Sequence, residues 1–298
     1  MRYVFFGTPS FAALVLKEII SAGLPPIALV CNPNRPVGRK KVITPPLTKI
    51  IAENYNLSSK LYNLNPIQIL QPEKLDAAFL DKLRSLNADF YVVAAYAKIF
   101  KKDFLTTPRL GVIGVHPSLL PKYRGASPIQ SAILSGDEET GVNIFMLTPG
   151  IDNGDIIAGQ GVKIKDKNYL ELEKELAEIG GKLLVKVLPD FVAGRIKPEP
   201  QDHSKATLTK KFTSEDGFVS HEDLQMAEEI GGAKAAEIER KIRALGEEPG
   251  VYTMISGKPS SAEALKGKRV KILKASLVDG KLKIEQIQKE GGKPSNFY

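Results

Sequence analysis

The stretch MRYVFFGTPSFAALVLKEIISAGLPPIALV (residues 1–30) predicts three elements in order. Arg2–Gly7 is a short apolar run, typical of a strand buried on both faces in a parallel sheet. The pair Thr8–Pro9 predicts the start of a helix, with the threonine as its cap and the proline as its first residue, and Gly23 predicts its end. Leu24–Val30 predicts the second strand. A strand, a helix and a second strand in this order are the unit from which α/β folds are built.

The same alternation continues through the first half of the chain. Two further helices and two further strands are predicted, over Pro46–Tyr55, Leu75–Leu86, Phe90–Ala94 and Val112–Val115. We therefore predict a doubly wound, mostly parallel sheet of the Rossmann-like α/β class, with helices on both faces. The lone Gly7 lacks the spaced glycines of a dinucleotide fingerprint, which argues against a nicotinamide cofactor.

Open parallel sheets bind their ligands beyond the carboxyl ends of the strands. The loops after Phe6, Val30, Ala94 and Val115 are therefore expected to share one edge of the sheet. We expect a binding site at that edge.

The second half of the chain differs in composition from the first. A long helix is predicted over Leu170–Phe191, after which residues 193–211 are polar, contain prolines and lack periodicity. We predict a catalytic domain over residues 1–192, a linker over residues 193–211 and a second domain over residues 212–298. The second domain combines a helical stretch with short strands separated by glycines, a pattern typical of a small OB-like β-barrel.

Composition excludes several classes of protein. The 298 residues are 43% hydrophobic and 26% charged, as in globular proteins. No apolar run reaches the roughly 18 residues of a membrane-spanning helix, and the opening residues lack the pattern of a signal peptide. Cys31 is the only cysteine and the three histidines are scattered, so we expect neither a disulfide framework nor a metal site. A cytosolic location is expected, and two domains are consistent with a monomer.

The most informative stretch is GVIGVHPSLLPKYRGASPIQ (residues 111–130). A predicted strand runs into His116, and Pro117 stops any helix at that point. A histidine at the exit of a central strand lies where active sites form, and imidazole is the group best suited to proton transfer near neutral pH. A buried structural histidine is equally compatible with this position.

A second stretch, Thr148–Ile157 (TPGIDNGDII), places two acids in a glycine-flanked loop after the strand predicted over Val142–Leu147. A carboxylate from Asp152 or Asp155 would orient His116 and favour its protonated form. Aspartate beside glycine is also typical of ordinary turns, so both interpretations stay open for these two residues.

Together, HPSLLPKYRG and GIDNGDII resemble the paired motif of the 10-formyltetrahydrofolate-dependent formyltransferases. That motif joins an Asn-x-His at a strand end to an aspartate 36 residues beyond the histidine, and 36 residues separate His116 from Asp152 here. The resemblance implies that His116 donates a hydrogen bond to the reacting formyl oxygen. It also implies that Asp152 is the catalytic acid that orients the histidine and relays a proton. The similarity extends over nearly the whole chain.

The chain departs from this motif at one important position. Gly114-Val115-His116 stands where the family has Asn-x-His, so the asparagine donor is absent. Loss of one such donor typically lowers turnover by about a hundred- to a thousandfold, or roughly 3–4 kcal/mol. Asn143, Asn153 or an ordered water is the candidate replacement.

Three further segments resemble those members of the family that formylate the methionine carried by initiator tRNA. They are the opening FFGTPSFA, the basic insertion NPNRPVGRKKVITPP and the end of the chain. Between Cys31 and Lys49 there are five basic residues and no acid, and from Lys258 to Lys293 there are ten basic residues and four acidic ones. Such clusters are typical of phosphate contacts, although an isolated basic loop is more often simply solvated. The net charge of +8 permits a polyanionic partner.

The resemblance also implies which residues line the two substrate sites. The formyl donor, 10-formyltetrahydrofolate, is expected against Ala94, Ala95, Tyr96, Ala97, Ser118, Leu119, Leu120, Pro121, Gly150 and Ile151. The methionyl initiator tRNA is expected against Phe11, Arg35, Gly38, Arg39, Lys40, Lys41, Lys268, Arg269 and Lys271.

Three hypotheses remain open. An active formyltransferase for methionyl initiator tRNA accounts for the motif pair and the basic segments. A formyltransferase for another amine, such as a nucleotide-linked amino sugar, should ignore tRNA. A tRNA- or folate-binding homologue that has lost catalysis should bind tRNA with a strong salt dependence and turn nothing over.

Overall fold

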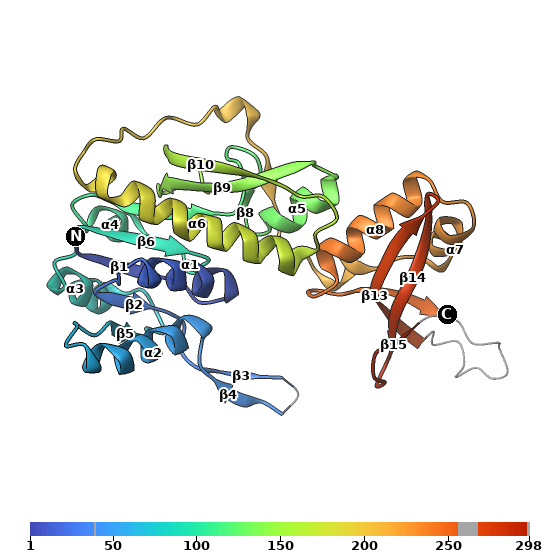
Figure 1. The fold of residues 1–298 in the computed structure, drawn as a ribbon, viewed down its shortest axis with the longest axis horizontal. Coiled ribbons are helices and arrows are strands. Elements are labelled where there is room, and N and C mark those ends of the chain that lie inside the picture. The colour runs from blue at the N-terminus through green and yellow to red at the C-terminus, as the bar shows by residue number, and fades with distance from the viewer. Residues whose placement is uncertain (39, 256–267, 297–298) are drawn as a thin grey trace. The chain divides into compact units, whose positions relative to one another are not determined.

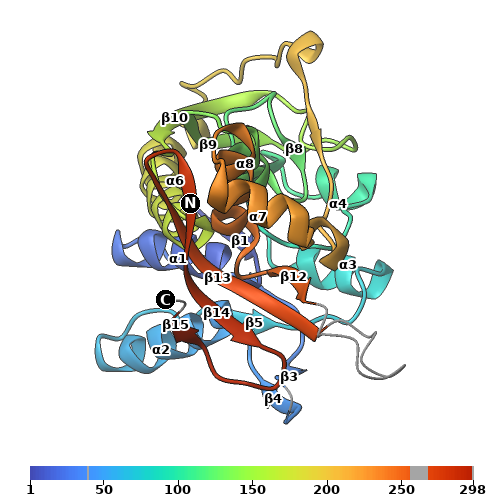
Figure 2. The same cartoon turned by 90° about the vertical axis from the view of Figure 1, so that its right-hand side faces the viewer.

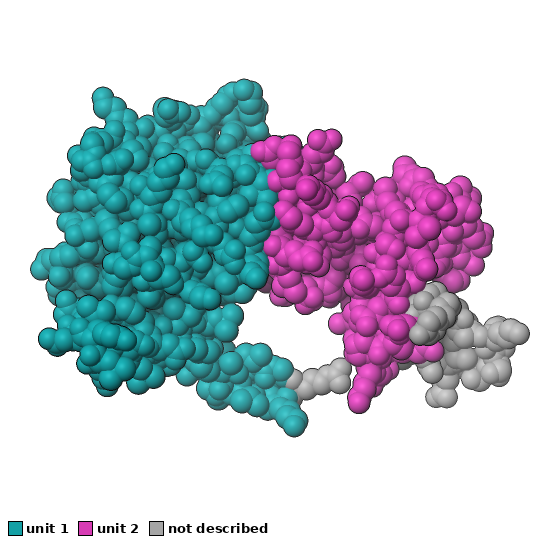
Figure 3. All heavy atoms as spheres, viewed as in Figure 1, with its two compact units in different colours: residues 1–125, 140–162, 173–208 teal, residues 126–139, 163–172, 209–298 magenta. Residues whose placement is uncertain are grey.

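The structure is a computed structural model that describes residues 1–38, 40–255 and 268–296 (Figure 1). The chain divides into two compact units (Figure 3). Unit 1 comprises residues 1–125, 140–162 and 173–208, and unit 2 comprises residues 126–139, 163–172 and 209–298.

Unit 1 is built on a seven-stranded sheet with the strand order β10-β9-β7-β6-β1-β2-β5. The strands are β1 (Tyr3–Phe6), β2 (Ala28–Val30), β5 (Gln68–Leu70), β6 (Phe90–Ala94), β7 (Val112–His116), β9 (Glu139–Met146) and β10 (Ile156–Lys163). Strands β5, β2, β1, β6 and β7 pair in parallel, and β9 pairs antiparallel to β7. The predicted mostly parallel α/β sheet is therefore confirmed. Because β1, β2, β6 and β7 run the same way, the loops that follow them share one edge, as expected.

Helices cover both faces of this sheet (Figure 1). They are α1 (Ser10–Ser21), α2 (Leu47–Leu61), α3 (Ala77–Ser85), α4 (Lys102–Thr106) and α6 (Tyr169–Val192). On one face, Phe6 of β1 is buried with Leu83 of α3 and Phe104 of α4. On the other face, α6 packs so closely on α1 that a Cβ at Gly181 would lie 2.5 Å from Cβ of Glu18. The glycine in the middle of this helix is explained by the close approach of the two helices.

The first turn of the chain corrects one prediction. Helix α1 begins at Ser10, Pro9 is its N-cap residue, and no side chain caps it. The hydroxyl of Thr8 instead accepts a hydrogen bond from the backbone N–H of Asn32, at 3.1 Å. Thr8 therefore ties the loop after β1 to the loop after β2, and its prediction as a helix cap was wrong. The predicted end of this helix is confirmed, because α1 ends at Ser21 and Gly23, with φ +76°, follows the C-cap residue Ala22.

Sequence patterns missed several short elements and misplaced others. The predicted basic loop contains a hairpin of β3 (Arg35–Val37) and β4 (Val42–Thr44). The strand predicted over Leu24–Val30 is confined to β2, and the helix predicted over Pro46–Tyr55 extends to Leu61. Also unpredicted were β5, α4, β8 (Arg124–Gly125), α5 (Pro128–Ser135), β10, η1 (His203–Lys205), β11 (Leu208–Thr209) and η2 (Ser214–Gly217).

Unit 2 contains a four-stranded antiparallel sheet in the order β12-β13-β14-β15. Its strands and helices are α7 (His221–Glu229), α8 (Ala233–Leu245), β12 (Val251–Ile255), β13 (Lys268–Val278), β14 (Lys281–Lys289) and β15 (Ser295–Asn296). Strands β13 and β14 run side by side (Figure 2), and α8 packs against both of them. The glycines predicted to interrupt the helical stretch, Gly231 and Gly232, separate α7 from α8 with φ +83° and +71°. The short strands predicted at the end of the chain are confirmed, and where an OB-like barrel was predicted the described residues form this four-stranded antiparallel sheet.

None of the helices in the described part of the chain is long and apolar enough to cross a membrane.

Candidate active site

His116 is the last residue of β7 and lies at the carboxyl edge of the sheet. Its side chain is buried, with 6% of its surface exposed. Nε2 lies 2.9 Å from the carbonyl oxygen of Tyr123, and Nδ1 lies 3.6 Å from Oδ2 of Asp152. Because a carbonyl oxygen only accepts, Nε2 must carry the proton in the bond to Tyr123. The ring therefore turns Nδ1 towards the carboxylate.

Asp152 lies in the loop between β9 and β10, on the same edge as His116. Its backbone has φ +43°, a left-handed conformation that residues other than glycine rarely adopt. Oδ2 accepts a hydrogen bond from the backbone N–H of Gly125 at 2.7 Å. Of the two acids that the sequence left open, Asp152 faces the histidine, whereas Asp155 is exposed.

The space beside Gly114 is filled by apolar side chains. Gly114 pairs across the strands with Phe145 of β9, and a Cβ at this glycine would lie 2.3 Å from Cε1 of Phe145 and 2.5 Å from Cδ1 of Leu147. Cβ atoms essentially never approach other heavy atoms this closely. The Phe145 ring is buried and stands edge-on to the His116 ring, with 6.2 Å between centroids. Phe145 therefore occupies the volume in which a side chain at position 114 would begin.

Asn143 and Asn153 are the two candidates to replace the missing asparagine donor. Asn143 lies directly across from His116 in β9, but its Oδ1 accepts from the N–H of Leu120 at 2.7 Å and its Nδ2 lies 3.4 Å from the carbonyl oxygen of Ala158. Its side chain thus holds the loop after His116 against β9. Asn153 accepts a hydrogen bond from the Thr148 hydroxyl. The Asn143 amide is thus engaged at both its oxygen and its NH₂ group, whereas the bond to Asn153 engages only the oxygen of its amide.

The residues predicted to contact folate lie in three loops at this edge. Ala94 ends β6, and Ala95 and Ala97 are exposed in the loop that follows it. Tyr96 is buried between these alanines, and burial raises the pKa of its hydroxyl to about 12, so the phenol is neutral at physiological pH. Its ring contacts Phe6 at 5.6 Å between centroids.

The second and third loops follow His116 and β9. In the second, the Ser118 hydroxyl donates to the Lys122 carbonyl at 2.7 Å, and Leu120 is held by Asn143. Leu119 and Pro121 are half-buried in the same loop. In the third, Gly150 is exposed and Ile151 exposes 63% of its surface, directly beside Asp152. An exposed isoleucine next to the polar pair of His116 and Asp152 is suited to covering an apolar ring system.

The residues predicted to contact tRNA in unit 1 lie on the β3–β4 hairpin, apart from Phe11, which is buried in α1. Gly38 has φ +70° in the hairpin turn, and Lys40 and Lys41 are exposed there. Arg35 forms an ion pair with Glu73 at 2.7 Å. Arg39 lies outside the described residues.

In unit 2, the residues predicted to contact tRNA lie within β13. Lys268 begins this strand, and its side chain lies outside the described residues. The Arg269 guanidinium stacks on the Tyr252 ring, with 3.6 Å from Cζ to the ring centroid. Lys271 is half-buried and faces the same neighbouring strand, where Tyr252 is its register partner.

No sequence pattern marked the residues that hold His116 and Asp152 in place. Tyr123, Arg124 and Gly125 lie within the stretch that carries the histidine, but nothing in the motif assigned them contacts. Gln201 falls in the polar segment predicted as a linker, yet it belongs to unit 1, is buried, and donates to the backbone of the Asp152 loop. The role of Gln201 in holding this loop is visible only in the tertiary structure.

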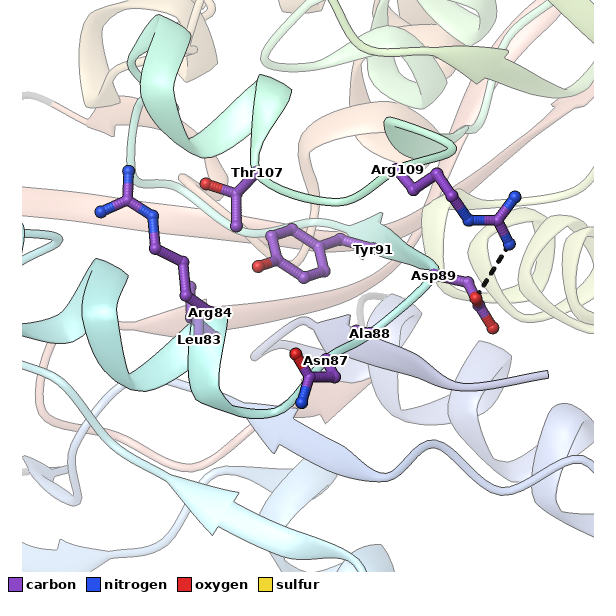
Figure 4. A pocket seen from close by; sticks show the side chains of 8 residues that line it. All are labelled: Leu83, Arg84, Asn87, Ala88, Asp89, Tyr91, Thr107 and Arg109. Carbon is purple, nitrogen blue, oxygen red and sulfur yellow. Dashed lines mark hydrogen bonds and ion pairs between the residues drawn. The ribbon is translucent and has the colours of Figure 1, made fainter.

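Among the residues that the structure describes, the cysteine and the potential metal ligands do not form a second reactive centre. Cys31 is fully buried, and burial raises the pKa of its thiol to about 11, so it is not a nucleophile at neutral pH. No group of three or more potential metal ligands occurs among the residues that the structure describes. A pocket of about 290 Å³ lies at the amino end of β6, at the edge opposite His116, where Arg109 pairs with Asp89 at 3.0 Å (Figure 4).

Comparison with known proteins identifies the family of the chain. The family model described as formyl transferase matches residues 1–188, and the formyl transferase C-terminal domain matches residues 232–283. A methionyl-tRNA formyltransferase from Chloroflexus aurantiacus is 41% identical over 261 residues, which cover 87% of this chain and 78% of that protein.

Solved structures show the same fold. A methionyl-tRNA formyltransferase from Clostridium thermocellum superposes with a TM-score of 0.57 at 18% identity, covering 97% of this chain and 98% of that one. HypX from Aquifex aeolicus, solved with tetrahydrofolic acid, has a TM-score of 0.62 at 14% identity, and this chain covers 46% of its length. Because its N-terminal 188 residues match the family model and its relatives align over most of their length, the chain belongs to the formyl transferase family.

Proposed function

We propose that this protein transfers the formyl group of 10-formyltetrahydrofolate to the α-amino group of methionine on initiator tRNA. The observation that carries the proposal is the pairing of the buried His116 with the half-buried Asp152, 3.6 Å apart at the carboxyl edge of a formyl transferase sheet. The relative at 41% identity, named for activity on methionyl-tRNA, supports this acceptor over an amino sugar.

The geometry suggests a role for each partner. In the transfer, the amine nitrogen bonds to the formyl carbon, the bond from that carbon to the folate nitrogen breaks, and one proton moves from the amine to the folate nitrogen. Because Nε2 of His116 is held by the Tyr123 carbonyl, the free ring atom is Nδ1. Nδ1 faces the Asp152 carboxylate, and a proton on this atom is the one that the ring can donate to the formyl oxygen as charge develops there. Asp152 takes the proton that leaves the amine and passes it to the folate nitrogen, so that the carboxylate is regenerated.

The residues around this pair suit a folate. The donor supplies the formyl group, and the chain supplies an apolar wall and backbone polar groups. Ile151 is exposed beside the pair, and the neutral Tyr96 hydroxyl is a buried donor without a hydrogen-bond partner among the described residues. We assign folate binding to the loops of Ala94–Ala97, Ser118–Pro121 and Gly150–Ile151.

Binding of tRNA is assigned to two basic surfaces. In unit 1, the tRNA is bound by the exposed lysines of the β3–β4 hairpin, Lys40 and Lys41. In unit 2, it is bound by the basic strand β13. Lysine and arginine contacts to phosphate release counterions, so the affinity for tRNA should fall steeply as salt rises. Accordingly, we assign catalysis to a domain over residues 1–192, whose hairpin also contacts the tRNA, and we assign a dedicated tRNA-binding domain to residues 212–298.

We also place the protein in the cytosol as a monomer. The buried Cys31 thiol suits a reducing compartment, and the acceptor is a substrate of translation. Light scattering of the purified chain should give the mass of one chain, 32.5 kDa.

A matched pair of variants tests the activity. The purified chain is incubated with 10-formyltetrahydrofolate and methionyl initiator tRNA, and formylmethionyl-tRNA is measured in a single turnover. Asp152→Asn should lower the rate by about a hundredfold or more, whereas Asp155→Asn, exposed in the same loop, should not. A parent chain that binds tRNA but forms no product would indicate a homologue that has lost catalysis. Formylation of an amino sugar nucleotide instead of tRNA would identify the acceptor as a sugar.

A further inference from the structure

One side chain holds the turn of Asp152 from a distance in sequence. Nε2 of Gln201 donates to the carbonyl oxygen of Asp152 at 2.9 Å and to that of Gly154 at 2.6 Å. Gln201 exposes 5% of its surface. Its NH₂ group therefore bridges the two carbonyls that flank Asn153, across the segment where Asp152 has φ +43°. A left-handed backbone at a residue other than glycine persists when its surroundings hold it there.

The orientation of this amide is determined by Arg124. Nε and Nη2 of Arg124 donate to Oε1 of Gln201, at 3.1 and 2.6 Å, and Arg124 is itself buried. A guanidinium group only donates hydrogen bonds, so the oxygen of the Gln201 amide must face it. The NH₂ group must then face the carbonyls of Asp152 and Gly154. The amide cannot be flipped without losing hydrogen bonds on both sides.

The residues next to Arg124 contact both members of the candidate pair. The Tyr123 carbonyl accepts from Nε2 of His116, and the Gly125 N–H donates to Oδ2 of Asp152. The tripeptide Tyr123–Gly125 therefore holds the histidine ring and the carboxylate directly. Through the Arg124 side chain and Gln201, it also holds the backbone of Asp152. The positions of the histidine and the aspartate are therefore both fixed by the same short segment.

We propose that Gln201 is a positioning residue for formyl transfer, acting through the Asp152 turn and held in its working orientation by Arg124. The inference rests on the proposed function, because it takes Asp152 as the proton-relaying acid. Gln201 itself touches neither His116 nor the Asp152 carboxylate in the bonds described. Its effect should therefore appear in the turnover number and not in the affinity for either substrate. A displacement on the order of 1 Å of a catalytic group costs about a hundredfold in rate.

The test uses Gln201→Glu. The glutamate has the same shape and accepts from Arg124, but its ionised carboxylate donates nothing to the two carbonyls. The matched control is Gln160→Glu, on an exposed position of β10. We expect kcat to fall roughly 30- to 100-fold in Gln201→Glu, with KM for folate and for methionyl-tRNA within twofold of the parent. The control should match the parent in both constants.

Hydrogen exchange gives a readout that does not depend on activity. In Gln201→Glu, the amides of residues 152–155 and the Gly125 N–H, which Asp152 holds, should exchange about tenfold faster or more. Unchanged kcat, or a loss of kcat with unchanged exchange in this loop, would overturn the proposal. An inactive parent would instead refute the proposed function, and the exchange data would still decide whether Gln201 holds the turn.

A second variant guards against a trivial loss of folding. Gln201→Met keeps the length of the side chain and brings no charge into the buried site. It should also lower kcat while KM is kept. Full activity in Gln201→Met would contradict a positioning role. Unfolding of both variants, seen as a lost thermal transition, would make Gln201 a structural residue and would equally overturn the proposal.

Discussion

The candidate active site and the basic surfaces of this protein are built on different physical terms. His116 and Asp152 are held by short, directional hydrogen bonds from the Tyr123 carbonyl and the Gly125 N–H. The lysines of the β3–β4 hairpin, Lys40 and Lys41, are exposed to solvent. Buried hydrogen bonds depend on tenths of an ångström, whereas exposed charges act over the Debye length, about 8–10 Å. A mutation in the first region should change rates, and a mutation in the second should change salt-dependent affinity.

The strongest test of this difference removes the imidazole. His116→Ala should lower single-turnover formylation by at least about a hundredfold, because it removes the proposed donor to the formyl oxygen. The dissociation constant for tRNA should stay within twofold. His221→Ala, at an exposed position that begins α7, is the control. Equal turnover in the two variants would remove His116 from the mechanism.

The second test concerns the missing asparagine. Gly114→Asn alone should fail to raise turnover and should destabilise the fold by about 1–3 kcal/mol, because its Cβ meets the Phe145 ring. Gly114→Asn combined with Phe145→Leu should recover part of this stability and raise the single-turnover rate roughly 10- to 100-fold, since only the Leu147 side chain then has to shift for the amide to donate beside His116.

Phe145→Leu alone is the control for that pair of changes. It should lower the melting temperature and leave the rate near that of the parent. If Gly114→Asn alone raises turnover with an unchanged melting temperature, the ring of Phe145 moves aside easily and the two positions are not coupled.

The third test addresses the hairpin. Lys40→Ala with Lys41→Ala should weaken tRNA binding about tenfold at low salt and lower the slope of log Kd against log salt by up to about 2. The rate of the bound complex should not change. Lys182→Ala with Lys186→Ala, two exposed positions of α6, controls for the loss of net charge. Identical salt slopes in the two double variants would mean that the hairpin does not meet phosphate.

The smallest expected effect lies at a residue with features of both regions. Arg269 was predicted to bind tRNA, but its guanidinium stacks on Tyr252. Arg269→Ala should therefore lower the free energy of unfolding, measured in urea, by about 1 kcal/mol. It should weaken tRNA binding less than Lys271→Ala does. A larger loss of binding in Arg269→Ala would show that its charge reaches the RNA from the stacked position.

Comparison of individual elements shows where sequence patterns succeed. The buried strands Phe90–Ala94 and Val112–His116 are apolar runs of the right length, and both are strands in the structure. The basic insertion folds into the β3–β4 hairpin, which its polar composition did not indicate, because its exposed side chains lack the alternation of a half-buried strand. Local patterns succeed where burial imposes them.

The amino-acid sequence by itself determined the α/β class and the edge at which the site forms, and its resemblance to the formyltransferase motif indicated the pairing of His116 with an aspartate 36 residues later. These follow from hydrophobic periodicity and from a motif confined to two short segments. Tertiary structure alone decided which groups hold that pair. Gln201 reaches Asp152 from 49 residues away, and Phe145 fills the space beside Gly114 from the neighbouring strand. Such contacts depend on strand register and chain packing, which bring together side chains with no shared local pattern.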